Sequence, residues 1–120
     1  MSQDTDKKTG PDLRIETLDG TTTFRPGEPI DGLAAWELDK KRDVTVRLFW
    51  RTEGKGTQDI GLEAEVEFED AAATDAQPFH FTAPQGPYSF DGRLVAIVWT
   101  LELHAGKHAE RLDITITPGE

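Results

Sequence analysis

The sequence predicts an all-β protein: an antiparallel, immunoglobulin-like sandwich of two sheets with seven or eight strands. Apolar and polar side chains alternate with a period of two along several segments. Short stretches rich in glycine and proline separate those segments. No window of twelve residues has the 3.6-residue periodicity of an amphipathic helix. Closure of the strands into a barrel is the alternative architecture.

The alternation places all the strands in one domain, residues 13–120. They are expected at residues 13–18, 21–25, 30–38, 43–52, 59–69, 78–83, 93–104 and 110–117. The preceding residues, 1–12, are polar and have little to bury, so we expect a disordered N-terminal tail.

Local turn chemistry predicts how the first strands are joined. Asp19-Gly20 tolerates positive φ angles and therefore favours a tight hairpin between the first two strands. The stretch Pro26-Gly27-Glu28-Pro29 ends their pairing, because proline cannot donate a hydrogen bond to a sheet. Residues 39–42 then form a charged turn.

Residues 43–52 and 59–69 show the clearest alternation and should form a hairpin around the glycine-rich residues 53–58. One face of each strand is apolar: Val44, Val46, Leu48 and Trp50 on the first, and Ile60, Leu62, Ala64, Val66 and Phe68 on the second. The other face of the second strand carries glutamates. Matching the apolar residues predicts four pairs: Trp50–Ile60, Leu48–Leu62, Arg47–Glu63 and Phe49–Gly61.

The C-terminal half alternates loops and strands. Loops are expected at residues 70–77 and 84–92, on either side of a short strand with Phe79 and Phe81 inward. The long strand 93–104 is apolar on both faces in its first half, which predicts cover on both sides there. Its core face and that of the last strand comprise Val95, Ile97, Trp99, Leu101, Leu103, Leu112, Ile114 and Ile116.

Composition limits the classes of partner. The 120 residues include 13 basic and 23 acidic side chains, for a net charge of −10, which disfavours nucleic acid and anionic membranes. No apolar stretch approaches the ~20 residues of a membrane span, and the N-terminus lacks the apolar centre of a signal peptide. The sequence has no cysteine, which suits a reducing compartment, and we expect a cytoplasmic protein.

Residues 63–69 and 84–91 supply the candidates for partner binding. Glu63, Glu65 and Glu67 form an acidic stripe; a solvated face explains it, and a patch for a basic partner or divalent cation is the functional alternative. Tyr88 and Phe90 lie in a loop, where binding residues often occur. For Phe90, closing one end of the sandwich is the favoured interpretation.

Neither catalysis nor a cofactor is predicted. Nucleophilic catalysis needs a Ser, Cys or Thr beside a base, and Ser89 has no histidine near it in sequence. His104 and His108 flank a predicted turn, but two imidazoles fall short of the three or four ligands that zinc prefers. Stray surface histidines explain them better than a metal site does.

Two segments resemble arrestin-type amino-terminal domains. Phe24, Pro26-Gly27-Glu28, Ile30 and Gly32 are similar to the start of that fold. A later group is similar to its segment before and within a long strand: Phe79, Phe81, Pro87, Ser89, Phe90, Gly92, Ile97, Trp99 and Leu101. Arrestins, the arrestin-like retromer subunit and bacterial sporulation-control proteins share the fold. Those proteins have two such sandwiches, and their long strand often has a tyrosine where this chain has Trp99.

The resemblance implies a noncatalytic adaptor or scaffold that binds a protein partner through a sheet edge or the loop at 84–91. Self-association into a homodimer is a further expectation, because a lone sandwich leaves an edge or face available. The alternative function is a domain that binds a small ligand or a divalent metal.

Overall fold

Nine strands and one short 3-10 turn make up the described part of the chain, residues 12–54, 58–92 and 95–118 of this computed structural model. The elements are β1 (Asp12–Thr17), η2 (Leu18–Gly20), β2 (Thr23–Phe24), β3 (Pro29–Glu37), β4 (Arg42–Gly54), β5 (Ile60–Ala71), β6 (Thr74–Thr82), β7 (Phe90–Asp91), β8 (Val95–Ala105) and β9 (His108–Ile116). The all-β prediction is confirmed, with nine described strands instead of seven or eight. Of the expected tail at 1–12, only Asp12 lies within the described residues, and it begins β1.

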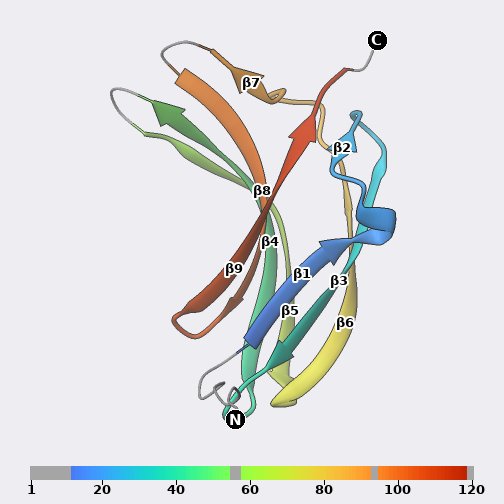
Figure 1. Cartoon of the computed structure of the whole chain (residues 1–120), viewed down its shortest axis with the longest axis vertical. Helices are drawn as coiled ribbons and strands as arrows, with labels where there is room; N and C mark the ends of the chain where they lie inside the picture. Colours follow the sequence, from blue (N-terminus) through green and yellow to red (C-terminus); the bar gives the residue numbers. More distant parts are fainter. Residues whose placement is uncertain (1–11, 55–57, 93–94, 119–120) are drawn as a thin grey trace, which may run out of the picture.

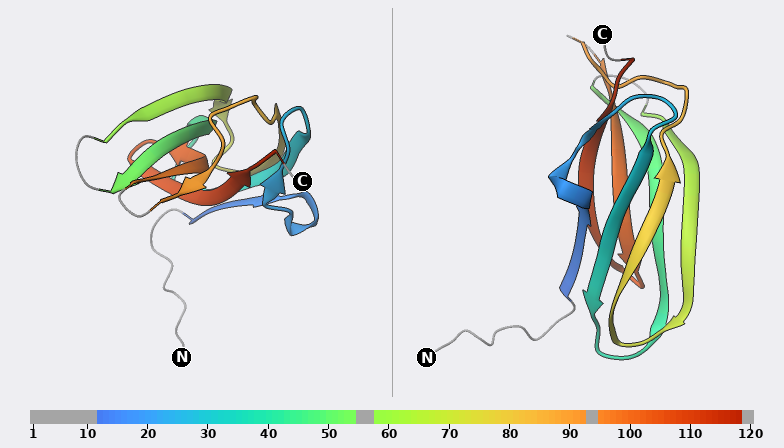
Figure 2. Two further views of the ribbon diagram at one scale, coloured as in Figure 1. Left: turned by 90° about the horizontal axis from the view of Figure 1, so that it is seen from above. Right: turned by 90° about the vertical axis from the view of Figure 1, so that its right-hand side faces the viewer.

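Two sheets of unequal size form the sandwich. The smaller sheet has the order β1-β3-β6, and the larger has the order β2-β9-β8-β4-β5, with β7 also paired to β8. All pairs are antiparallel except β2–β9. The right-hand view of Figure 2 looks onto the three-stranded sheet, with the larger sheet behind it. In Figure 1 the free ends of β4 and β5, and of β7 and β8, curve away from the smaller sheet.

The space between the sheets holds the apolar core. Its fully buried side chains are Trp99, Ile30, Leu48, Leu101, Leu103, Ile116, Val44 and Val46. Phe79 and Phe81 enter the same core from β6, as their alternation predicted, with ring centroids 5.8 Å apart. Trp50 and Trp99 were expected inward: Trp99 is buried and Trp50 is half-buried against the core, and Trp36 of β3 is buried as well.

The turn at Asp19-Gly20 forms, but the hairpin predicted around it is wrong. Asp19 has a φ of 59° and Gly20 a φ of 70°, and the Thr21 amide donates to the Leu18 carbonyl at 3.2 Å. β1 nevertheless pairs with β3, and β2 crosses to the larger sheet to pair with β9. The turn redirects the chain from one layer to the other.

The hairpin of β4 and β5 is confirmed, but its predicted register is wrong. Val46 lies opposite Val66 and Leu48 opposite Ala64; beyond them the register shifts by one residue. Phe49 then lies opposite Leu62 and Trp50 opposite Gly61. The shift is a β-bulge that leaves Glu63 without a partner on β4, so residues on either side of it exchange faces.

Two further expectations fail, one at the connection between β5 and β6 and the other along β8. Residues 70–77 are not a loop, because β5 continues to Ala71 and β6 starts at Thr74. The first half of β8 is its more exposed half, since it lies where β4 and β8 curve away from the smaller sheet (Figure 1). The second half is the part covered on both faces, with Thr100 and Glu102 buried on the outer side.

Candidate functional site

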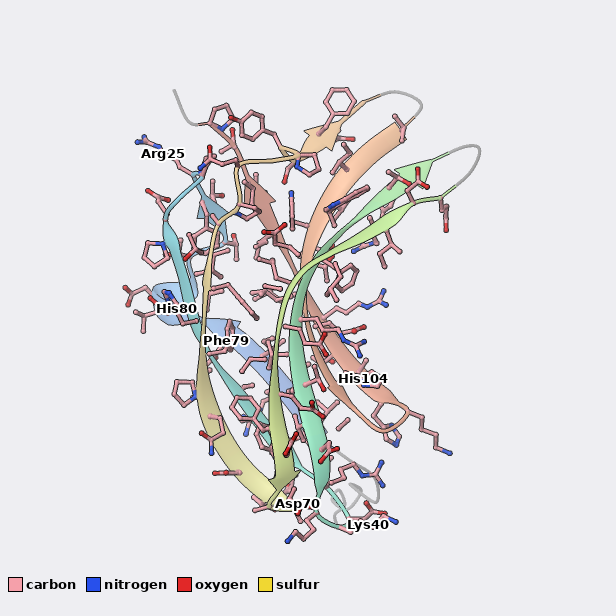
Figure 3. All side chains as sticks on the ribbon, turned by 180° about the vertical axis from the view of Figure 1, so that it is seen from behind. Arg25, Lys40, Asp70, Phe79, His80 and His104 are labelled. Carbon is pink, nitrogen blue, oxygen red and sulfur yellow. The ribbon has the colours of Figure 1, made fainter. Side chains whose placement is uncertain are left out.

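A groove of about 500 Å³ crosses the outer face of the six-stranded sheet, the face turned away from the smaller sheet. We call it the face groove. Its lining comes from four neighbouring strands and the β8–β9 turn: Arg47, Phe49, Ile60, Leu62, Glu102, His104, Lys107, Ala109 and Arg111. Figure 3 shows His104 on this outer side of the sheet.

The bulge in β5 supplies the apolar part of the groove. On the C-terminal side of the bulge, Ala64, Val66 and Phe68 pack against the core. On its N-terminal side, Ile60 and Leu62 project to the outer face and are 68% and 60% exposed. The prediction that these two residues point inward is therefore wrong. The two side chains are neighbours on the same face and form the apolar side of the groove.

Phe49 forms the floor between the apolar and charged parts of the groove. It is only 4% exposed, although it lies on the outer face of β4. Leu62 lies opposite it on β5, and the guanidinium carbon of Arg111 lies 5.6 Å from its ring centroid. This separation is that of a cation–π contact between the guanidinium and the ring.

A row of alternating charges crosses the sheet beside Phe49. Glu102 on β8 is buried, and both of its carboxylate oxygens contact arginines: Oε2 is 2.9 Å from Arg111 Nε, and Oε1 is 3.6 Å from Arg47 Nη1. Arg47 also lies 3.9 Å from Glu65 on the edge strand. The row fixes both arginines, since the buried carboxylate depends on them for its partners.

A second network of polar contacts is centred on Arg51 and lies on the same outer face, next to Phe49 along β4. Arg51 binds Glu53 at 2.8 Å and Asp113 at 3.4 Å, and it also donates to the hydroxyl of Thr100. Burial lowers the pKa of the Arg51 guanidinium, but the hydrogen bonds and charges of Glu53 and Asp113 outweigh burial and raise it. Arg51 is therefore a permanent structural cation of the sheet.

The acidic stripe lies next to the groove. Glu63, Glu65 and Glu67 are exposed along β5, at the edge of the larger sheet. Glu63 is the bulged residue, and Glu65 contacts Arg47 of the groove. The structure thus brings the predicted stripe beside the new site and makes it one rim of that site.

The loop candidates lie at another place, near the upper end of the sandwich. The loop is held there: the Trp99 indole donates to the Pro87 carbonyl at 2.6 Å, and the Ser89 amide donates to the Ile116 carbonyl at 2.8 Å. Tyr88 is exposed. Phe90 is 55% exposed in β7, so the expectation that it closes the end of the sandwich is wrong.

The two candidate metal ligands are not brought together. In the β8–β9 register His104 lies opposite Ala109, and His108 lies opposite Ala105, the next residue along. Neighbouring pairs in a sheet project to opposite faces, so the two imidazoles leave the hairpin on different sides. The described residues contain no group of three or more His, Cys, Asp or Glu side chains arranged to hold a metal.

Sequence reasoning missed most of the groove. Phe49 gave the one available signal: it is a large aromatic residue on the otherwise polar face of its strand, between Arg47 and Arg51. Lys107 and Arg111 carried no signal, because single basic residues near a turn are common on protein surfaces.

No helix in the described part of the chain is long and apolar enough to cross a membrane.

Comparison with solved structures shows the fold. The chain is similar to the sporulation control protein Spo0M from Bacillus subtilis, with a TM-score of 0.55 and 20% sequence identity over 89% of this chain. That match covers 48% of Spo0M, so the chain spans about half the length of that protein. The predicted resemblance to arrestin-like sandwiches, sporulation-control proteins included, is confirmed at the level of fold.

The same fold also occurs inside an enzyme. A mutant β-glucosidase from Listeria innocua in complex with laminaribiose matches 89% of this chain with a TM-score of 0.51 and 10% identity, but only 16% of the enzyme is covered. The glucose complex of the enzyme gives a TM-score of 0.50 with the same identity and 16% coverage. Identities this low carry the fold and no activity. No protein-family model and no curated protein matches the sequence.

Proposed function

We propose that this chain is a noncatalytic protein-interaction module and that the face groove is its binding site. The observation that carries the proposal is the outward placement of Ile60 and Leu62 beside a groove whose arginines are already fixed. A partner that covers these two side chains gains apolar burial, and the fixed arginines lose little conformational freedom on binding.

The position of the groove supports the same proposal. It lies on strands of a packed sheet, so a partner meets a preformed surface. A sandwich fold shared with Spo0M is compatible with a regulatory role that requires binding and no chemistry. Because the sequence lacks cysteine, we place the interaction in a reducing compartment such as the cytoplasm.

Site-specific photo-crosslinking tests the proposal. A photo-reactive amino acid at position 62 should crosslink one or a few proteins in an extract of the organism that encodes the chain. The same amino acid at position 18 is the matched control, because Leu18 is exposed to a similar degree but lies on η2, outside the groove. Equal crosslinking from both positions, or none from position 62, would refute the proposal.

A further inference from the structure

The chemistry of the face groove specifies its partner, if the proposed function holds. We infer that the groove binds an acidic, amphipathic protein segment, in which carboxylate side chains lie beside apolar ones. The inference rests on the distribution of charge, hydrogen-bond donors and apolar surface among the lining residues.

The groove carries basic side chains, whereas the chain as a whole is negatively charged. Its lining contains three basic side chains, Arg47, Lys107 and Arg111, and the single carboxylate of Glu102. With Glu65, whose carboxylate lies 3.9 Å from Arg47, the three basic side chains face two carboxylates, so the remaining excess of positive charge lies toward Lys107 and the β8–β9 turn, on a chain whose net charge is −10. A partner bound at contact distance meets this local positive charge. At physiological ionic strength, carboxylates farther away than ~8 Å are largely screened.

The groove's free hydrogen-bonding groups are mostly donors. Glu102 is buried, and both of its oxygens already contact arginines, so it offers little to a cationic ligand. Arg111 uses Nε for that contact, and none of the described residues accepts a hydrogen bond from its Nη atoms. Lys107 is exposed and forms no ion pair with any described residue. Carboxylates complement such donors.

Apolar surface occupies the other part of the same groove. Ile60 and Leu62 project from β5 with most of their side chains uncovered, and Leu62 lies opposite the buried ring of Phe49. A purely charged ligand would leave this apolar surface in water. A purely apolar ligand would cover the free donors without pairing them, which is unfavourable. Only a ligand with both features fits the whole lining.

The acidic stripe sets the direction in which such a segment lies. Glu63, Glu65 and Glu67 run along β5, on the side of the groove where Ile60 and Leu62 project. They repel carboxylates placed there. The segment's acidic side chains therefore lie over β9 and the β8–β9 turn, near Arg111 and Lys107, and its apolar side chains lie over β5.

Peptide display on the whole chain tests this inference. A random peptide library is selected at 0.15 M NaCl, and enriched peptides are synthesised and titrated by calorimetry. We expect Asp or Glu together with Leu, Ile, Phe or Trp in the enriched sequences. We expect Lys107→Glu and Leu62→Ser each to raise Kd about tenfold. Peptides in which lysine replaces the acidic residues should have a lower Kd for the Lys107→Glu variant than for the original chain.

Two matched variants control for charge and surface changes elsewhere. Lys40→Glu makes the same charge change in the β3–β4 turn, which Figure 3 shows at the lower end of the molecule. Leu18→Ser removes an equally exposed leucine from η2. Both should leave Kd within about twofold of its original value.

Several results would overturn the inference. In the selection, these are no enrichment at all, or enriched peptides that are basic or uncharged. In the titrations, they are an equal loss of affinity in the control variants, or displacement of the peptide by the fatty acid anion decanoate at a similar concentration, which would indicate a lipid ligand. Self-association of the chain that Leu62→Ser abolishes would indicate that a second copy occupies the groove. Basic peptides that still require Leu62 would refute only the acidic partner and leave the interaction module intact. Absence of crosslinking from position 62 would instead refute the proposed function.

Discussion

Gly61→Ala tests whether the contact between Trp50 and Gly61 holds the bulged register of β4 and β5. Gly61 lies opposite Trp50, and a Cβ atom added to it would lie within 3.0 Å of three atoms of the indole ring. The backbone of Gly61 lies outside the left-handed region, so alanine is not strained there by its φ angle. The substitution therefore perturbs the ring contact and little else.

The expected loss follows from two opposing effects. Trp50 is packed against the core on one side, so its ring cannot retreat freely from the new methyl group. Overpacking of this kind costs about 1–3 kcal/mol. Replacing glycine by alanine offsets about 0.4–1 kcal/mol of that, because it restricts the unfolded chain. The added Cβ would overlap Trp50 Nε1, so the overpacking cost falls in the upper part of its range, and the net loss is about 1–2.5 kcal/mol. A loss of that size lowers the Tm of a domain of this size by roughly 4–10 °C.

Urea and thermal unfolding, followed by circular dichroism and tryptophan fluorescence, measure the loss. The same substitution in a Trp50→Leu background serves as the control, since there the ring is absent and the cost of Gly61→Ala should fall below about 0.5 kcal/mol. Two results would refute the reasoning: a Gly61→Ala protein as stable as the original, or an equal cost in both backgrounds.

Three further substitutions or additions have outcomes set by single features. Trp36→Phe removes the indole hydrogen bond to a carbonyl of the β5–β6 connection at 2.9 Å and should cost about 1 kcal/mol in urea unfolding; an unchanged midpoint would contradict this. Gly106→Ala should cost at least about 1 kcal/mol, because Gly106 has a φ of 62° and an added Cβ would overlap the Arg42 guanidinium. Thermal melting measures it, and an equal Tm would be the contrary result. Added zinc should leave the Tm unchanged, since His104 and His108 project to opposite faces. A rise in Tm that saturates at one zinc ion per chain would contradict this.

Alternation predicted the core well where strands are regular. Val44, Val46 and Leu48 on β4 are fully buried, as their spacing indicated, and so are Leu101 and Leu103 on β8. These strands lie in the middle of the larger sheet, where one face meets the other sheet over many residues. Burial there follows directly from a period of two.

Alternation failed where one extra residue enters β5. Ile60 and Leu62 have the same parity as Ala64 and Val66, so the sequence gives no sign that they lie on a different face. The outcome is decided across the strands: Phe49 is covered by Leu62, and the ring of Trp50 fits over Gly61. Pairwise packing of large and small side chains is not visible in the pattern of either strand alone.

Turn chemistry predicted local geometry but not pairing. Asp19-Gly20 adopts the positive φ angles that its composition favoured. The strands on either side still separate, because β1 forms six residue pairs with β3, whereas β2 is two residues long. The longer ladder determines where the chain goes, and it depends on residues distant in sequence.

The bulge also explains why Ile60 and Leu62 are available to the proposed binding surface. Burying a leucine or isoleucine side chain contributes about 1.5–3 kcal/mol, and β5 leaves most of that unrealised at both Ile60 and Leu62. The pairing of Leu62 with Phe49 and the close fit of Gly61 to Trp50 place both residues on the outer face, so their exposure follows from the register of β4 and β5. A partner that covers them recovers burial that the isolated chain cannot obtain. For this reason the proposed acidic amphipathic segment should lose affinity on Leu62→Ser as strongly as on Lys107→Glu.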